Sequence, residues 1–372
     1  MHIVHVFSAL YQGGAETQLE LLINHSLKNN PEVKHTVISL KRDVTPLWIR
    51  LEGMGVTVLT CNLDSPLNLY SILTLRRILS SFTSSDIIQC WMYHANFLAT
   101  VASIGLRKKL IWNIRRTQIP IGITGLIARL SARLSFLFPV KIVCCATAAK
   151  ESHIELGYNP DNMTVIHNGI DTERFVPNKA FGISFRSQIG IEKGDFVLGV
   201  IGRYAPVKGH VYLLQAFREL MSNSQNINQN IKLVMIGRNI ANASELLPYL
   251  RDKSLKEHLI IIPERTDIHK LIPALDLLCL PSESEGFPNV VAEAMSCGVP
   301  TLVSDVGDAA FIVNNTDMVV LPCDSSAIAK RIEQFIKSPN LDKFNISKVS
   351  RERVIRYFSV EESWRKYLLL YK

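Results

Sequence analysis

Short runs of β-branched and apolar residues alternate with helical patterns along this 372-residue chain, and this alternation constrains its fold more than any other feature. The run HIVHVF (2–7) is typical of a buried strand, and the apolar residues of AETQLELLINHSL (15–27) recur at the helical period. Strands that alternate with helices predict a parallel, doubly wound α/β sheet. Further strand candidates in the first half are 35–40, 56–60, 86–91, 109–114 and 140–145.

The same pattern starts again after a proline-containing stretch at 175–177. We therefore expect two Rossmann-like domains, 1–176 and 177–358, and the length of the chain fits two domains. The last segment, 359–372, has the pattern of an amphipathic helix. Ligands of open α/β sheets bind beyond the carboxyl ends of the strands, so we expect the two domains to face a cleft. Strand candidates in the second half are 195–203, 232–237, 259–263, 277–280 and 300–304.

The positive charge of the chain, formally +8, is concentrated in one stretch. No acidic residue lies between Asp86 and Glu151, whereas nine basic residues do. Within this stretch, 123–138 has a helical pattern with leucines and isoleucine on one face, and two arginines four residues apart on another. Such a helix fits an anionic membrane surface, or a helix packed on its sheet with solvated arginines. The residues expected at the membrane surface are Arg107, Lys108, Lys109, Arg129 and Arg133.

The cysteines and the N-terminal residues predict a cytoplasmic protein. Seven cysteines without a C-x-x-C pair lie mostly in apolar runs, which favours buried thiols in a reducing compartment. The sequence MHIVHVFSAL lacks the basic start of a signal peptide, and no stretch is apolar enough to span a bilayer. We expect a protein bound peripherally to the inner face of the cell membrane, and no nucleic acid partner, because the motifs of nucleic-acid-binding proteins are missing.

Three segments at strand ends carry candidate ligand-binding residues. The first turn, SALYQGGAE, is not G-x-G-x-x-G, but Gly13 and Gly14 would let the backbone approach a phosphate at a helix N-terminus. In GVIGRYAPVKGH, Arg203 and Lys208 follow a strand and could neutralise a diphosphate, although two solvated loop cations would look the same.

The segment LPSESEGFPNVVAEAMSCGVP (280–300) is the most informative. Pro288 suits the first turn of a helix, which puts Glu285 before the helix and Glu293 inside it. Two carboxylates at this spacing could accept hydrogen bonds from sugar hydroxyls at either side of a helix N-terminus that faces phosphate. A capping role for Glu285 is the simpler alternative, but it does not explain why Glu293 lies on a mostly apolar helix.

With these segments the chain resembles the retaining glycosyltransferases of the GT-B fold, family 4, whose E-x7-E motif corresponds to Glu285 and Glu293. The chain also resembles the members of this family that build bacterial O-antigen and capsule. In the family the last helix crosses back onto the first domain, and the resemblance implies the same for 359–372. The matching motifs are QGGAE (12–16), WMYHAN (91–96), WNIRRT (112–117), HNGID (167–171), GRYAPVKGH (202–210), PERTDI (263–268), LPSESEGFPNVVAEAM (280–295) and SDVGDA (304–309).

The resemblance implies a role for each matching residue. Glu293 would bind the ribose of a nucleotide sugar, Arg203 and Lys208 its diphosphate, and His94 the donor sugar. Arg115 would hold a phosphate of the acceptor. The catalytic set implied is His94, Arg203, Lys208 and Glu285. The donor-binding set implied is Gly13, Gly14, Arg203, Lys208, Arg265, Glu285, Gly286, Phe287, Pro288, Asn289 and Glu293.

We therefore expect a retaining transferase that moves a hexose or N-acetylhexosamine from a nucleotide-diphosphate sugar, UDP rather than GDP, to a polyprenyl-diphosphate-linked glycan. No D-x-D motif follows a strand, so we expect no cofactor and no required metal, the phosphate charge being met by cationic side chains and a helix dipole. The alternatives are a sugar-nucleotide epimerase of the same fold and a non-catalytic protein that binds nucleotide sugars.

Overall fold

The computed structural model describes residues 1–11, 13–62, 69–83, 86–138, 140–222 and 229–372, so that Gln12 of the first motif lies outside the described residues. The chain forms two compact units, one of Met1–Gly169 with Val360–Lys372 and one of Ile170–Ser359. The chain thus leaves the first unit at Gly169, somewhat before residue 176, where the sequence suggested a boundary. Each unit contains one wholly parallel sheet, and the predicted α/β fold is confirmed.

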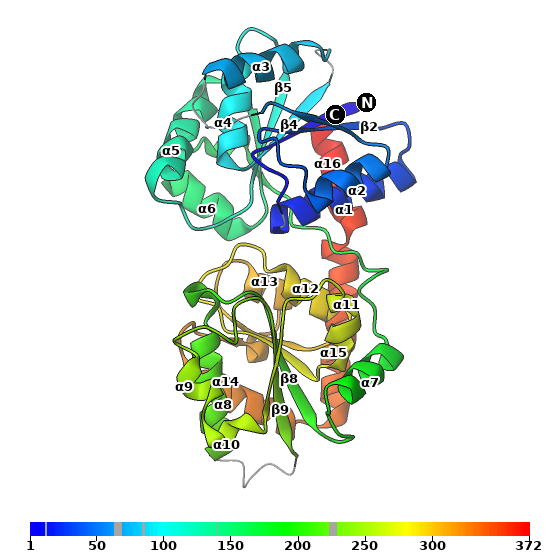
Figure 1. Ribbon diagram of the computed structural model, residues 1–372, viewed down its shortest axis with the longest axis vertical. Helices are drawn as coiled ribbons and strands as arrows, with labels where there is room; N and C mark the ends of the chain where they lie inside the picture. Colours follow the sequence, from blue (N-terminus) through cyan, green and yellow to red (C-terminus); the bar gives the residue numbers. More distant parts are fainter. Residues whose placement is uncertain (12, 63–68, 84–85, 139, 223–228) are drawn as a thin grey trace. The chain divides into compact units, whose positions relative to one another are not determined.

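The first unit has a seven-stranded sheet in the order β3-β2-β1-β4-β5-β6-β7 (Figure 1). The order runs outward from β1 in both directions, as in a doubly wound sheet, so right-handed crossovers place helices on both faces. The strands are β1 (His2–Phe7), β2 (Lys34–Ser39), β3 (Thr57–Thr60), β4 (Ile87–Trp91), β5 (Lys109–Ile114), β6 (Val140–Cys144) and β7 (Met163–Val165).

The helices of the first unit form two groups. Figure 1 shows α1, α2 and α16 together on one side of the sheet and α3, α4 and α5 on the other. The helices are α1 (Gly14–Asn29), α2 (Pro46–Gly53), α3 (Leu69–Ser80), α4 (Met92–Ala102), α5 (Gly122–Leu137), α6 (Thr147–Glu155) and α16 (Val360–Tyr371), with a 3-10 turn η1 at Pro160–Asn162.

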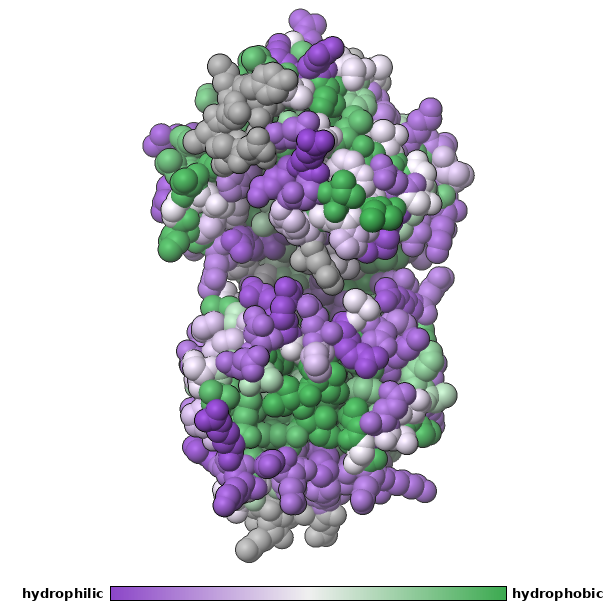
Figure 2. Space-filling view, in the orientation of Figure 1, coloured by the Kyte–Doolittle hydropathy of each residue, from purple (hydrophilic) through white to green (hydrophobic). Residues whose placement is uncertain are grey.

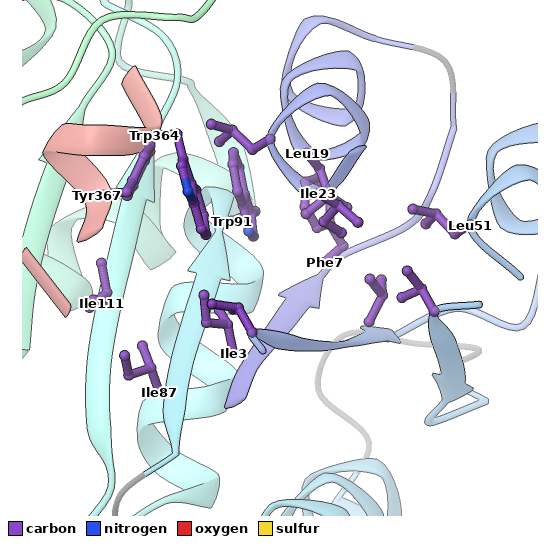
Figure 3. Close-up of a cluster of buried hydrophobic side chains, with 14 of the residues drawn as sticks. Ile3, Phe7, Leu19, Ile23, Leu51, Ile87, Trp91, Ile111, Trp364 and Tyr367 are labelled. Carbon is purple, nitrogen blue, oxygen red and sulfur yellow. The ribbon is translucent and has the colours of Figure 1, made fainter. Parts of the chain in front are cut away.

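Helix α16 contributes its aromatic residues to the core of the first unit. Trp364 and Tyr367 pack with Trp91, next to apolar residues of β1, α1 and α2 (Figure 3). The Tyr367 hydroxyl donates to Asn113 Oδ1 at 2.7 Å and the Tyr371 hydroxyl donates to Gln89 Oε1 at 2.5 Å, both inside the core. The helix therefore joins the first unit through apolar contacts and through buried hydrogen bonds.

The second unit has a six-stranded sheet in the order β10-β9-β8-β11-β12-β13. Its strands are β8 (Phe196–Ile201), β9 (Ile231–Ile236), β10 (Leu259–Ile262), β11 (Leu277–Leu280), β12 (Thr301–Ser304) and β13 (Val319–Val320). Its helices are α7 (Lys179–Gln188), α8 (His210–Ser222), α9 (Leu247–Leu250), α10 (Lys253–Lys256), α11 (Ile268–Leu271), α12 (Asn289–Ser296), α13 (Ala309–Val313), α14 (Ser325–Lys337) and α15 (Asn340–Phe358). Short 3-10 turns are η2 (Pro206–Lys208), η4 (Ile272–Ala274) and η5 (Thr316–Met318).

The order of the second sheet brings β8 next to β11, and this neighbourhood positions the candidate site. The chain turns from β8 toward β9 on one side, and β11 pairs with the opposite edge of β8. The strand order therefore reverses between them, which is where open α/β sheets form their ligand sites. Within the described residues, no helix combines the length and the apolar character that crossing a bilayer requires.

Candidate functional site

The loops that follow β8 and β11 are bound to each other. The Glu283 amide donates to the Val207 carbonyl at 2.8 Å. Gly209 has a positive φ of 64°, and a Cβ atom there would lie 1.9 Å from the Pro281 carbonyl oxygen. A side chain at position 209 would thus be strained and would also push the two loops apart.

This contact brings two predicted residues, Lys208 and Glu285, into an ion pair. Lys208 Nζ lies 2.7 Å from Glu285 Oε1, and the Ser282 hydroxyl donates to the same oxygen at 2.7 Å. The Glu285 side chain is only 10% exposed, so the pair is partly shielded from solvent. Its attraction is therefore stronger than that of a typical surface pair. Ser282 was not predicted from the sequence.

Arg203 lies at the start of the same loop and is exposed. The turn around it is tight, because a Cβ atom on Gly237 would lie 2.0 Å from the Gly202 carbonyl oxygen. Among the described residues, Arg203 makes no ion pair, in contrast to Lys208. Its guanidinium is thus available to an anionic ligand near the carboxyl end of β8.

The segment 285–289 leads directly into α12. Gly307, with a φ of 56°, packs so closely that a Cβ atom there would lie 2.5 Å from the Glu285 and Gly286 carbonyl oxygens. The Asp308 amide donates to the Gly286 carbonyl at 2.9 Å, which fixes the loop. Pro288, expected in the first turn of the helix, is its N-cap, and α12 begins one residue later at Asn289. The first backbone amides of α12 thus end close to the Lys208–Glu285 pair.

Phe287 has a side chain that points away from this loop. It is 7% exposed and packs edge-to-face on Phe358, with ring centroids 5.5 Å apart. The ring therefore anchors the loop in the core, and only the backbone of Phe287 is available to a ligand. The sequence did not separate these two uses of the residue.

Glu293 lies in the second turn of α12 among buried Ala292, Ala294 and Met295. The apolar surroundings raise the pKa of its carboxyl to about 7, and the charge of Arg174 lowers it again in part. Arg174 donates to His269 Nδ1 and to the Thr266 carbonyl, both at 3.3 Å. Arg174 was not predicted, since it follows HNGID far from the E-x7-E segment in sequence.

Arg265 forms a closed pair with a neighbour instead of a free cation. Its guanidinium donates to both carboxylate oxygens of Asp267, at 2.8 and 2.7 Å. The pair raises the pKa of Arg265 and lowers the pKa of Asp267. Both residues lie between β10 and α11 at the surface, so a donor near this loop would meet a neutral pair.

The first unit presents a second group of predicted residues, with His94 at its centre. Strand β4 passes directly into α4 at Met92, which has a φ of 70°, an unusual value for a residue with a side chain. His94 lies in the first turn of α4 and is half-buried. Burial, and next the charge of Lys41, lowers the pKa of its imidazole. The side chain is therefore neutral at pH 7 and able to accept a hydrogen bond.

Arg115 lies one residue beyond β5 and covers the ring of Trp91, with the guanidinium carbon 4.8 Å from the ring centroid. Its Nε and Nη1 atoms are buried and have no hydrogen-bond partner among the described residues. A buried donor without a partner is costly, and a guanidinium matches the geometry of a phosphate or carboxylate. Arg115 is thus the residue of the first unit that is best prepared to bind an anion.

Gly13 and Gly14 begin α1, but the turn is shared with a carboxylate that was not predicted. A Cβ atom on Gly13 would lie 2.6 Å from Glu16 Oε2, so the Glu16 side chain folds back over the helix N-terminus. Burial raises the pKa of Glu16, and its bond to the backbone opposes this in part. The turn therefore leaves less room for a phosphate than its glycines suggested.

The basic residues predicted at a membrane surface divide into two kinds. Arg107, Lys109, Arg129 and Arg133 are exposed. Lys108 instead donates its ammonium hydrogens to the backbone carbonyls of Phe82 and Thr83. Lys108 therefore fixes the chain before β4, which makes it a structural residue.

Two family models match the chain. "Glycosyltransferase Family 4" matches residues 12–174, and "Glycosyl transferases group 1" matches residues 183–352. The first match covers most of the first unit and continues to residue 174 of the second, and the second match lies within the second unit, where the Lys208–Glu285 pair lies. Together the two matches include every predicted site residue.

Two bacterial glycosyltransferases are among the curated relatives with similar sequences. An Escherichia coli "UDP-Gal:alpha-D-GlcNAc-diphosphoundecaprenol alpha-1,3-galactosyltransferase" is 28% identical over 59% of this chain, and the match spans 57% of that relative. The Staphylococcus aureus "capsular polysaccharide biosynthesis glycosyltransferase CapM" is 25% identical over 91% of this chain and 85% of its own. Among solved structures, HepE from Anabaena in complex with UDP superimposes with a TM-score of 0.86 at 19% identity, over all of this chain and 99% of HepE.

Proposed function

This chain belongs to the GT-B glycosyltransferases, with a family 4 domain followed by a group 1 domain. From that premise we propose that it transfers a hexose or N-acetylhexosamine from a UDP-sugar to a lipid-linked glycan. We propose that the transfer retains the configuration at the anomeric carbon. UDP is favoured because HepE was solved with UDP and with UDP-glucose. A diphosphate-linked lipid acceptor and a role in surface polysaccharide synthesis are supported by the names of the E. coli and S. aureus relatives.

The observation that carries the proposal is the Lys208–Glu285 pair beside the N-terminus of α12. A cation and a helix N-terminus at the carboxyl ends of neighbouring strands suit a diphosphate, because both supply positive potential. In the proposed reaction Lys208 and Arg203 stabilise the negative charge that develops on the leaving diphosphate. Glu285 holds the Lys208 ammonium in place, and its other carboxylate oxygen is available to a hydroxyl of the donor sugar.

We assign Glu293 to the ribose of the donor. A carboxylate accepts two hydrogen bonds from neighbouring hydroxyls only when it is ionised. Apolar surroundings work against ionisation, and the positive charge of Arg174 favours it. Arg174 therefore belongs to the donor site through its effect on Glu293.

The first unit supplies the remaining roles in the proposal. His94 accepts a hydrogen bond from a hydroxyl of the donor sugar, and Arg115 binds a phosphate of the acceptor through its unpartnered donors. For retention we favour attack from the same face as the departing diphosphate, whose oxygen takes the proton of the acceptor hydroxyl. The glycosidic bond to the diphosphate breaks, the bond to the acceptor oxygen forms, and UDP leaves with the proton.

The test is the release of UDP or GDP from a panel of nucleotide sugars, with and without a bacterial lipid extract. We expect release from one UDP-sugar, stimulation by the lipid, and loss of at least a hundredfold in rate in Glu285→Ala, since it removes the partner of Lys208. Glu283→Ala is the matched control, because Glu283 is exposed in the same loop. Epimer formation from donor alone would replace the proposal by the epimerase alternative, and donor binding without turnover would replace it by a non-catalytic role.

A further inference from the structure

Helix α5 of the first unit packs through small residues and exposes its bulky ones. Its buried positions are Gly125, Ile127, Ala128, Ser131, Ala132 and Ser135. The sequence had suggested that Leu126, Ile127, Leu130, Leu134 and Leu137 form its apolar face. Of these five, Ile127 is buried, Leu130 and Leu134 are half-buried, and Leu126 and Leu137 are exposed.

The close contact with the rest of the unit explains this inversion. A Cβ atom on Gly125 would lie 2.1 Å from the Pro120 carbonyl oxygen, and Ala128 lies against the cluster that contains Tyr93. Ile127 and Ala128 pack with Tyr93 of α4, and the other buried positions of α5 are small, so most of the bulky side chains of the helix point outward. They are exposed by 63% at Ile123, 56% at Leu126, 62% at Phe136 and 73% at Leu137.

The exposed face of α5 also carries positive charge. Arg129 and Arg133 are exposed, and neither makes an ion pair with a described residue. At 3.6 residues per turn they project on the same half of the helix as Leu126 and Leu137. Hydrophobic and hydrophilic side chains lie side by side at the left edge of the first unit in Figure 2, where Figure 1 places α5.

More cations lie near the end of this helix. Exposed Lys109 precedes Leu110, which pairs with Val140, the residue at which β6 begins after α5. No acidic residue interrupts the sequence from Asp86 to Glu151. An exposed apolar patch on a soluble surface marks an interaction site, and its charge selects the partner.

We propose that the exposed face of α5, defined by Ile123, Leu126, Arg129, Arg133, Phe136 and Leu137, inserts into the interface of an anionic bilayer. The apolar side chains enter the boundary between headgroups and acyl chains, and the two arginines bind lipid phosphates. A second protein surface would need acidic groups to match the arginines, whereas an anionic leaflet supplies both the charge and the apolar phase. The inference deepens the proposed function, because it would bring the first unit to a lipid-linked acceptor.

The test is co-sedimentation of the full-length protein with 100-nm vesicles of phosphatidylcholine alone, or with a quarter of phosphatidylglycerol, in the absence of donor and acceptor. We expect binding to the anionic vesicles, reduced about tenfold or more in Leu126→Ser/Phe136→Ser/Leu137→Ser because buried apolar area is lost. We expect a similar reduction in Arg129→Glu/Arg133→Glu. Raising the concentration of phosphatidylcholine should not restore the vesicle binding of either variant. Ile49→Ser is the matched control, since Ile49 is 62% exposed on α2 of the same unit.

A second measurement follows insertion directly. A Leu126→Cys variant in a Cys323→Ser background, chosen because Cys323 is the exposed one among the seven thiols, is labelled with an environment-sensitive dye. We expect a blue shift of emission with anionic vesicles and quenching by lipids that carry a spin label on the acyl chain. A blue shift without vesicles that depends on protein concentration would instead identify the face as an interface between copies of this chain.

Vesicle binding can be measured independently of the proposed sugar transfer. Equal binding of wild type and the triple serine variant, or binding to neutral and anionic vesicles alike, would overturn the inference about α5. Lipid-free UDP release by the triple serine variant is expected to match wild type, since none of the three residues belongs to the donor site. Failure of the proposed function would instead appear as absent turnover in a protein that still binds vesicles.

Discussion

The ammonium of Lys208 and the carboxylate of Glu285, 77 residues apart in sequence, lie 2.7 Å from each other between two loops that are locked by Gly209. Lys208→Met keeps the length of the side chain and removes its charge. We expect a loss of about a hundredfold or more in kcat, because the leaving diphosphate loses a cation. Steady-state kinetics test this, with Lys256→Met as a control distant in sequence. Near-normal turnover in Lys208→Met would show that the pair only holds the loops together.

Glu293 is expected to make donor binding depend on pH. Its carboxyl has a pKa of about 7, so it is protonated in part at neutral pH and ionised in higher pH buffers. We expect KM for the donor to rise as the pH falls through about 7, because the protonated acid accepts fewer hydrogen bonds from ribose. In Glu293→Gln the KM should be raised at pH 8 and nearly flat below it. A wild-type profile that matches the glutamine variant would remove Glu293 from the ribose site.

The histidines His5 and His35 should make the first unit sensitive to acid. They are stacked in the core, with His5 Nε2 3.1 Å from His35 Nδ1, and burial lowers the pKa of His35 to about 4. The unfolded chain binds a proton at each histidine below about pH 6.5, whereas the folded protein does not. The contribution of these two histidines to the free energy of unfolding is therefore fully present above pH 6.5 and is lost as the pH falls toward 4.

Urea unfolding between pH 7.5 and 4.5 measures this loss. In His35→Gln we expect a smaller dependence on pH over this window, although the variant is less stable at pH 7.5. His258→Gln is the control, since His258 lies in the second unit and is half-buried. An unchanged slope in His35→Gln would place the acid sensitivity elsewhere.

The Tyr367 hydroxyl is expected to stabilise the attachment of α16. Tyr367→Phe removes the hydroxyl that donates to Asn113 Oδ1 in the core, and the loss of this hydrogen bond costs about 1–3 kcal/mol. Thermal unfolding of the first unit should shift to lower temperature, whereas Tyr357→Phe, at a residue 43% exposed on α15, should have little effect. Equal stability of the two variants would show that apolar contacts alone hold the helix.

Turnover is expected to continue without a divalent metal ion. In the proposal Arg203, Lys208 and the amides of α12 neutralise the diphosphate, which elsewhere is often the role of Mg²⁺. Treatment with EDTA followed by gel filtration should leave kcat unchanged, and added Mn²⁺ or Mg²⁺ should not raise it. A loss that Mn²⁺ restores would mean that the cationic side chains are insufficient and that a metal ion joins the donor.

The parts of the fold and of the site that depend on local sequence patterns could be predicted from the sequence. The strand at 2–7 was predicted at the correct residues and the start of the helix at Pro288 to within one residue, because periodicity and a proline near a helix start are local signals. The family resemblance placed Lys208 and Glu285 in one donor site, but their ion pair was not predicted, since nothing in the spacing of the two loops reveals that β8 and β11 are neighbours.

Other features depend on contacts that no local pattern encodes. The position of Arg174 near Glu293 results from a loop before α7, and no local pattern indicates it. For α5 the sequence left open a packed helix or a membrane-facing one, because hydrophobic periodicity does not show which bulky side chains are buried. In the structure Ile127 and Ala128 pack with Tyr93 of α4, whereas Leu126 and Leu137 are exposed.

The return of the chain to the first unit at Val360 has a consequence for biosynthesis. Trp364, Tyr367 and Tyr371 complete a core that Ile3 and Phe7 begin, yet all residues of the second unit are translated between them. On the ribosome the second unit can thus fold while the first unit still lacks its last helix. The early strands must wait, with part of their apolar surface uncovered, until α16 has been translated, and they are the segment on which a chaperone would act.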